Sequence, residues 1–364
     1  MLSTVRTYAS FVKFSHTVFA LPFAIAGMVA AYAVPTKMSS EVYGHIGGEH
    51  ATDGPLHVPF SWIVLLLILC CMVGARSFAM AVNRILDRRI DALNPRTAQR
   101  EIPAGVLSLR AAWLFALASA LLYFGACSLI GEVVLALSPI PVALMLLYPY
   151  TKRFTALCHL VLGASLGLAP IGAWVAVRGE RVHSFQFADG STGWRVPGIK
   201  AVVLGSDFPN HFYGIGWQAV TELTPWLLGA AVMLWVAGFD VIYALQDDEF
   251  DRANKLHSIP AALGRKRALQ LAILMHVSSY GFFFFFVDSL MKPALIAFGE
   301  GIGTYTQLDR FVWAAPFVMF AGMLYQHSLV KPNDLSRVNV AFFTVNGVIS
   351  VIFGAIFVAA WLLA

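Results

Sequence analysis

Charged residues are scarce in this 364-residue sequence: they make up 12% of it, whereas hydrophobic residues make up 59%. About 25% of the residues of a typical soluble domain are charged, so this scarcity excludes an ordinary soluble globular protein. The mean hydropathy of +0.72 leads to the same conclusion. The composition therefore indicates a protein that crosses a membrane several times.

Cysteine is also rare, and its four positions, Cys70, Cys71, Cys127 and Cys158, all lie within apolar segments. We interpret them as small buried hydrophobic side chains, which excludes a disulfide framework and a cysteine metal site. No convincing small-residue cleavage site follows the first apolar run. We therefore expect that run to be the first membrane helix rather than a signal peptide.

Long apolar runs are abundant. A transmembrane helix needs roughly 20 apolar residues, whereas barrel strands need about 10 and alternate in polarity. The runs here are long and do not alternate, so we predict an all-α polytopic membrane protein, a helix bundle around a central cavity open to the cytoplasmic side. Nine spans are predicted, near residues 15–34, 61–82, 111–130, 133–148, 156–177, 225–246, 268–287, 311–330 and 339–363.

Basic residues follow the predicted topology. Segments 1–14, 83–110, 149–155, 247–267 and 331–338 hold 2, 6, 2, 5 and 2 Lys or Arg, 17 of the 25. The positive-inside rule places these segments in the cytoplasm, with the N-terminus inside and the C-terminus outside an inner membrane. The pI of about 9.0 thus reflects topology and does not indicate nucleic-acid binding.

We expect one domain over residues 1–364. Residues 178–224 form an insert on the extracytoplasmic side, rich in Gly, Pro and Trp, which we interpret as a partly structured loop over the outer face.

A polar motif ends the second predicted span. Asn83, Asp87 and Asp91 are four residues apart and share one face of a helix, and Arg76 lies two turns earlier on the same side. The Pro- and Gly-containing segment that follows places Arg96 and Arg100 on a loop above the carboxylates. Oxygen ligands ringed by arginines suit a hard divalent cation and a phosphorylated substrate.

A second acidic row ends the sixth span. Spacings of 3, 4 and 4 place Asp240, Tyr243, Asp247 and Asp251 on one helical face, which Lys255 would continue by one turn. Asp240 lies within the hydrocarbon span, where an ionisable group is costly and is therefore a functional candidate.

Two acidic rows at the same membrane face predict a shared site. Mg²⁺ takes a few carboxylates and completes its shell with substrate phosphates and water, so two facing rows could hold a diphosphate. The membrane setting favours a diphosphate with a long isoprenoid tail. When diphosphate leaves an allylic carbon, a dry aromatic cavity protects the carbocation from water until an acceptor attacks.

These motifs, together with Tyr148-Pro149 and Lys152-Arg153, resemble the UbiA superfamily of intramembrane aromatic prenyltransferases over nearly the whole chain. The similarity is greatest to the 4-hydroxybenzoate polyprenyltransferase branch and its menaquinone-pathway relatives. The resemblance implies nine helices, Mg²⁺ dependence, and polyprenyl transfer from polyprenyl diphosphate onto a hydroxylated aromatic acid in ubiquinone or menaquinone biosynthesis.

The resemblance also implies residue roles. Asn83, Asp87 and Asp91 would form the first Mg²⁺-diphosphate motif, and Asp247 and Asp251 the second. Asp240 and Tyr243 would orient the acceptor phenol or stabilise the cation. Arg84 follows Asn83 where many relatives carry an acidic residue, so one possible ligand is missing. Arg76, Lys152 and Arg153 are candidates for binding the diphosphate or the acceptor's carboxylate. Further substrate-binding candidates are Arg96, Arg100 and Lys255, together with Asn83.

Three alternatives remain open. The acceptor could be 4-hydroxybenzoate or a hydroxynaphthoate. Asp240 in a polytopic protein would also suit a cation-coupled transporter, although transporter sites lie near the bilayer midplane and these carboxylates gather at one face. A membrane phosphotransferase is disfavoured because the sequence has no Gly-rich nucleotide loop.

Overall fold

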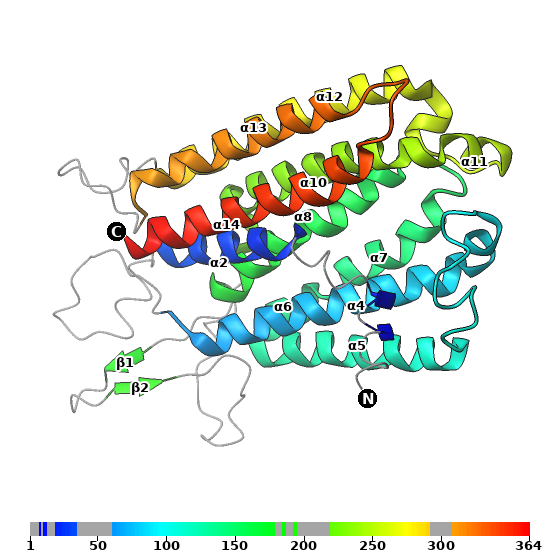
Figure 1. Ribbon diagram of the computed structural model, residues 1–364. Helices are drawn as coiled ribbons and strands as arrows, with labels where there is room; N and C mark the ends of the chain where they lie inside the picture. The colour runs from blue at the N-terminus through cyan, green and yellow to red at the C-terminus, as the bar shows by residue number, and fades with distance from the viewer. Residues whose placement is uncertain are drawn as a thin grey trace.

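The computed structural model of the protein describes residues 7–8, 10–12, 19–34, 60–178, 184–186, 192–194, 219–291 and 308–364. Its helices lie side by side along a common direction (Figure 1). In chain order they are α2 (Leu21–Ala33), α4 (Trp62–Leu93), α5 (Leu109–Ile130), α6 (Glu132–Leu137), α7 (Pro139–Thr151), α8 (Cys158–Arg178), α10 (Leu223–Ala244), η3 (Leu245–Asp247), α11 (Asp248–Ala253), α12 (Ile259–Met291), η4 (Arg310–Trp313), α13 (Ala314–Leu329), η5 (Val340–Val345) and α14 (Asn346–Leu362). Strands β1 (Ser184–Gln186) and β2 (Thr192–Trp194) form an antiparallel pair.

Seven segments of the described chain are long and apolar enough to cross a membrane: Trp62–Leu93, Leu109–Ile130, Glu132–Thr151, Cys158–Arg178, Leu223–Ala253, Ile259–Met291 and Val340–Leu362. Each coincides with a predicted span, so the all-α polytopic class is confirmed. The other two predicted spans correspond to the shorter helices α2 and α13, of 13 and 16 residues. Part of the first, residues 15–18, lies outside the described residues, and the count of nine stays a prediction.

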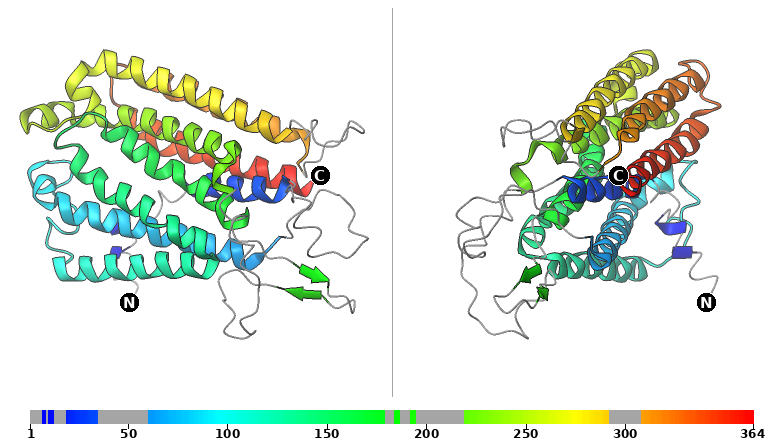
Figure 2. Two further views of the ribbon diagram at one scale, coloured as in Figure 1. Left: turned by 180° about the vertical axis from the view of Figure 1, so that it is seen from behind. Right: turned by 90° about the vertical axis from the view of Figure 1, so that its left-hand side faces the viewer.

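Helix α10 occupies the middle of the bundle and packs most extensively against α8 and α12. Glycines allow the close approach to α8: a Cβ on Gly163 would lie 2.2 Å from the Met233 carbonyl oxygen, and one on Gly167 would lie 2.5 Å from that of Gly229. Small residues are the usual means by which membrane helices pack closely. Figures 1 and 2 show α4 and α5 on the side of the bundle opposite α12 and α13, with α2, α8, α10 and α14 between.

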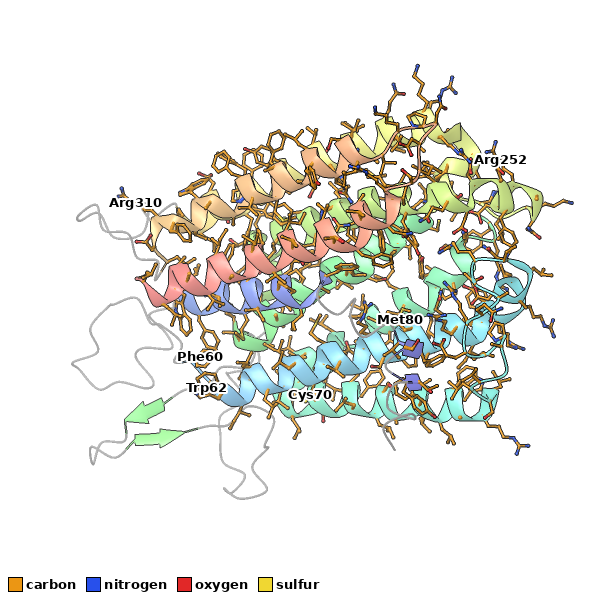
Figure 3. All side chains as sticks on the ribbon, in the orientation of Figure 1. Phe60, Trp62, Cys70, Met80, Arg252 and Arg310 are labelled. Carbon is orange, nitrogen blue, oxygen red and sulfur yellow. The ribbon has the colours of Figure 1, made fainter. Side chains whose placement is uncertain are left out.

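Polar side chains concentrate at one end of the bundle, which we call the polar end. It comprises the last turns of α4, residues 94–107, the end of α7, and η3 with α11. Arg252 lies there and Arg310 at the opposite end, whereas Cys70 lies along the apolar length of α4 (Figure 3). The first motif is helical as predicted, because α4 continues to Leu93.

The second motif differs from the prediction. Helix α10 ends at Ala244, a 3-10 turn covers Leu245–Asp247, and α11 begins at Asp248. The prediction of one continuous α-helical face is therefore wrong. Lys255 does not extend the face, because α11 ends at Ala253 and Lys255 has a left-handed φ of 55°. Most of the predicted insert 178–224 lies outside the described residues.

Candidate functional site

Two adjoining cavities occupy the bundle. The larger, of about 830 Å³, extends among α4, α5, α7, α8 and α10 and has a mostly apolar wall that also carries charged side chains, among them Arg76, Arg84 and Glu101. The smaller, of about 180 Å³, lies at the polar end. Seven residues line both: Asn83, Arg96, Thr97, Arg100, Tyr148, Asp240 and Tyr243. We call the smaller cavity the charged chamber; the larger cavity beside it is mostly apolar.

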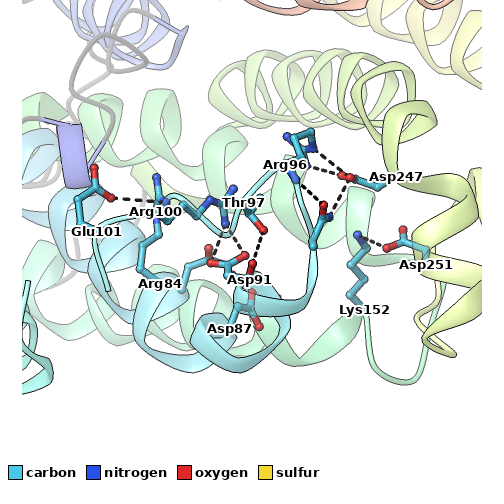
Figure 4. A network of polar contacts seen from close by, with 12 residues as sticks. Arg84, Asp87, Asp91, Arg96, Thr97, Arg100, Glu101, Lys152, Asp247 and Asp251 are labelled. Carbon is cyan, nitrogen blue, oxygen red and sulfur yellow. Dashed lines mark hydrogen bonds and ion pairs between the residues drawn. The ribbon is translucent and has the colours of Figure 1, made fainter. Parts of the chain in front are cut away.

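The end of α4 presents the first motif to the small cavity. Asn83 Nδ2 donates to Asp87 Oδ2 over 3.3 Å, as expected for residues one helical turn apart. Arg100 Nη1 donates to both carboxylate oxygens of Asp91, at 2.7 and 2.8 Å. Thr97 Oγ1 donates to the Asp91 carbonyl oxygen and ties the following loop back to the helix (Figure 4).

Arg96 joins the two acidic motifs. Its Nε and Nη2 donate to the two carboxylate oxygens of Asp247, and Nη1 donates to the Tyr243 hydroxyl at 2.9 Å. Asn94 Nδ2 adds a 3.2 Å hydrogen bond to Asp247. Burial disfavours the charged guanidinium, but the hydrogen bond and negative charge of Asp247 outweigh this effect and raise the pKa of Arg96. The loop after α4 is thereby fixed to η3, 151 residues further along the chain.

The segment after α7 completes the small cavity. Lys152 Nζ lies 2.8 Å from Asp251 Oδ1, and Arg153 Nη2 lies 3.3 Å from Asp87 Oδ1. Asp251 is fully buried, and no hydrogen-bond donor within the described chain reaches its Oδ2. Each of the four motif aspartates, Asp87, Asp91, Asp247 and Asp251, therefore pairs with a different basic side chain.

Asp240 is held separately. His159 Nδ1 lies 2.7 Å from Asp240 Oδ2, and the backbone N–H of Ile259 donates to His159 Nε2 at 3.3 Å. Because Nε2 accepts that bond, Nδ1 carries the proton and donates to the carboxylate. Asp240 thus keeps a fixed orientation where the two cavities meet.

The predicted site residues fall into three groups. Arg76 lines the larger cavity but not the smaller one. Its Nε has no hydrogen-bond partner among the described residues. Lys255 is exposed and lines neither cavity, because the chain turns away after α11. The remaining predicted residues all line the small cavity: Asn83, Asp87, Asp91, Arg96, Arg100, Lys152, Arg153, Asp240, Tyr243, Asp247 and Asp251.

The donor chemistry of the small cavity fits a hard cation. It offers one amide and four carboxylates of the predicted motifs, the oxygen ligands that Mg²⁺ prefers. In the described chain, no three His, Cys, Asp or Glu side chains are grouped closely enough to hold an ion, and each motif aspartate pairs with a base instead. The buried Asp251 Oδ2, which lacks a donor, is the atom whose surroundings a cation would satisfy best.

Sequence reasoning missed several participants. Asn94 and His159 bind Asp247 and Asp240 across the fold, and Phe342 stacks on Tyr243 with ring centroids 4.0 Å apart. The signal for His159 was available, since a histidine inside an apolar span deserves the same attention as Asp240. Arg84, noted as a departure in the sequence, lies 3.8 Å from Glu101 and does not line the small cavity.

Comparisons with known proteins agree with this architecture. The chain is 25% identical over 301 residues to 4-hydroxybenzoate octaprenyltransferase of Yersinia enterocolitica, covering 81% of this chain and 83% of that one. Its fold matches the apo structure of a UbiA homolog from Aeropyrum pernix K1 with a TM-score of 0.64 and 29% identity, covering 96% and 97% of the two chains. A UbiA homolog from Archaeoglobus fulgidus bound to GPP and Mg²⁺ matches with a TM-score of 0.58 and 18% identity over 98% and 99%. Residues 56–348 match the profile of the UbiA prenyltransferase family, and the chain belongs to that family.

Proposed function

We propose that this enzyme transfers a polyprenyl group from polyprenyl diphosphate to the ring of a hydroxylated aromatic acid, with 4-hydroxybenzoate as the acceptor and Mg²⁺ as the cofactor. The observation that carries the proposal is a charged chamber of about 180 Å³ joined to a mostly apolar cavity of about 830 Å³. A diphosphate suits the first chamber and an isoprenoid tail suits the second. The similarity to a 4-hydroxybenzoate octaprenyltransferase supports the choice of substrates.

The small chamber would hold the diphosphate. Arg96, Arg100, Lys152 and Arg153 all line it, and guanidinium groups bind phosphate oxygens through two hydrogen bonds at once. The ligands proposed for Mg²⁺ are Asn83, Asp87, Asp91, Asp247 and Asp251. Bound there, Mg²⁺ would neutralise the charge that develops on diphosphate as it departs.

The two cavities allow the diphosphate-binding and carboxylate-binding roles, which the sequence could not divide among the basic residues, to be assigned separately. Lys152 and Arg153 line only the small chamber, whereas Arg76 lines only the larger cavity. We therefore assign Arg76 to the carboxylate of the aromatic acid. Asp240, oriented by His159 at the junction, would hold the acceptor hydroxyl.

The reacting carbon would lie beside Tyr243, which lines both cavities. The aromatic faces of Tyr243 and Phe342 would stabilise the allylic cation and exclude water, and the acceptor ring would then attack it. From the distribution of basic residues we place the polar end in the cytoplasm and the protein in the inner membrane.

The experiment that tests this proposal is product formation by the purified protein in detergent or nanodiscs. Reactions would contain labelled polyprenyl diphosphate and Mg²⁺ with either 4-hydroxybenzoate or a dihydroxynaphthoate, and matched reactions would contain EDTA. Prenylated 4-hydroxybenzoate that disappears with EDTA is the expected result. Product only with the naphthoate would replace the acceptor, and no product from folded protein in either reaction would refute the proposal.

A further inference from the structure

A π-helix interrupts the last span. Val340–Val345 is a π-helical segment, and α14 follows it directly from Asn346. Phe342 and Phe343 belong to this segment and line the larger cavity. Such segments are rare, and they occur often at functional sites because the widened turn redirects side chains. In an α-helix, successive side chains point about 100° apart around the axis. A wider π-helical turn changes that angle, so the conformation of this segment determines where Phe342 points.

Phe342 is the centre of an aromatic cluster beside the charged chamber. Its ring stacks on Tyr243, with centroids 4.0 Å apart and planes inclined by 29°. It meets Phe239 and Phe19 edge to face, at 5.2 and 5.8 Å. Tyr243 in turn receives the hydrogen bond from Arg96 and lies under its guanidinium, 5.2 Å from the ring centroid. A continuous contact therefore runs from the charged chamber to the π-helix.

Two buried side-chain amides hold the π-helical backbone. Gln326 on α13 donates from Nε2 to the Ala341 carbonyl oxygen at 3.1 Å. Asn346, the first residue of α14, donates from Nδ2 to the Phe342 carbonyl oxygen at 2.9 Å. Both residues are fully buried, and neither lines either of the two cavities described above.

The oxygen atom of each side-chain amide shows which atom of the amide makes the useful contact. Gln326 Oε1 and Asn346 Oδ1 are buried, and neither has a hydrogen-bond partner in the described chain. A buried acceptor without a donor is costly, above all within a membrane, where polar groups are rare. These amides therefore contribute through their nitrogens, which bind carbonyl groups of the widened turn.

We propose that Gln326 and Asn346 are positioning residues, which fix the π-helix so that Phe342 stacks on Tyr243 at the reacting end of the cavity. The inference deepens and rests on the proposed function. When the allylic carbon–oxygen bond breaks, diphosphate leaves with the electron pair, and the cation is attacked either by the acceptor ring or by water. Attack by water yields free prenol and a proton. A displaced Phe342 opens the wall, so the share of prenol rises.

The first test measures the backbone and needs no activity. Gln326→Leu is compared with Ser279→Ala, which removes a buried 2.7 Å hydrogen bond from α12 to the Ala231 carbonyl oxygen, far from the π-helix along the chain. Hydrogen exchange followed by mass spectrometry should show amides 340–346 exchanging about 10-fold faster in Gln326→Leu and unchanged in Ser279→Ala. Unchanged exchange in a folded Gln326→Leu variant would overturn the positioning role of Gln326.

The second test measures products. In Gln326→Leu the ratio of prenol to prenylated aromatic should rise about 2- to 10-fold, the factor that the loss of one aromatic pair would produce. Adding Gln326→Leu to Phe342→Ala should change that ratio little further, because both act through the same ring. Additive effects, or a ratio equal to that of Ser279→Ala, would mean that Gln326 is merely structural.

Asn346→Leu is the second variant. It keeps the test decisive if Gln326→Leu fails to fold, since it removes the other bond to the same segment. Failure of the proposed function is a separate outcome, recognised when the unmodified protein forms no prenylated aromatic while the exchange difference persists. Normal exchange over 340–346 in every folded variant would refute the positioning role itself.

Discussion

Asp247 and Asp248 are adjacent carboxylates with different surroundings, and they allow a matched test of the site. Asp247 lines the small cavity and pairs with Arg96. Asp248 lines neither cavity and pairs with Arg252 and Arg265 at 2.6 and 2.8 Å. We predict that Asp247→Asn lowers turnover by at least about 100-fold, comparable to removing one electrostatic contact to a transition state. Asp248→Asn should leave turnover within about twofold, because Asp248, although buried, contacts Arg252 and Arg265 and lines neither cavity.

The two substitutions should cost similar stability. Asp247→Asn leaves an amide beside one arginine and Asp248→Asn leaves one beside two, and these arginines are partly solvated: Arg96 is 34% exposed, Arg265 32% and Arg252 53%. We therefore discount the cost for solvent screening and expect about 1–3 kcal/mol in each case. A difference in turnover at equal stability cannot come from unfolding.

The assay is kcat at saturating Mg²⁺ and substrates, with thermal unfolding of the same samples in detergent. Near-normal turnover in Asp247→Asn would refute the reasoning about the charged chamber. Equal loss of turnover in both variants would show that the loss reflects the fold of the η3–α11 corner rather than the lining of the chamber.

Three further predictions concern the two cavities and the metal. Gly172→Leu should lower activity with long-tailed diphosphates more than with short ones, because Gly172 lines the larger cavity and its Cβ would meet nothing within 4 Å. Gly125→Leu, on the exposed face of α5, should lower neither, and an equal loss with long and short tails in Gly172→Leu would exclude a tail path along α8. Arg76→Ala should raise KM for the aromatic acid about 10- to 100-fold with little change for the diphosphate, and Arg153→Ala should do the reverse; the same pattern in both variants would contradict our assignment. Chelation by EDTA should abolish product formation and added Mg²⁺ should restore it, whereas full activity in EDTA would exclude a divalent cation.

Local pattern explains what the sequence predicted well. Asn83, Asp87 and Asp91 follow an uninterrupted apolar run, so the helical period and their shared face could be read directly, and α4 carries all three. Seven of the nine spans predicted from long apolar runs are confirmed in the described chain for the same reason. Lys255 was misplaced although a signal was present: Asn254 precedes it, and Asn often marks the end of a helix.

Long-range pairing could not be predicted from spacing. Arg96 and Asp247 are 151 positions apart, and His159 and Asp240 are 81 apart, so only the packing of α4, α8 and α10 brings them together. The π-helix at Val340–Val345 was equally invisible, because an apolar run has the same composition whether its turns are α or π. Its stabilising bond comes from Gln326 on another helix.

The pairing of acids with bases explains how so many charges coexist at the end of a membrane bundle. An unpaired buried charge is far costlier than a paired one, and the free protein avoids it by setting each motif aspartate against a different base. A diphosphate alone would draw the bases away and leave carboxylates unpaired, and a cation alone would leave the bases unpaired. If both entered together, carboxylates and bases would exchange partners and no buried charge would be left unpaired. The proposed site is therefore balanced both empty and full, and half-occupied states are disfavoured. The four pairs are Asp87–Arg153, Asp91–Arg100, Asp247–Arg96 and Asp251–Lys152.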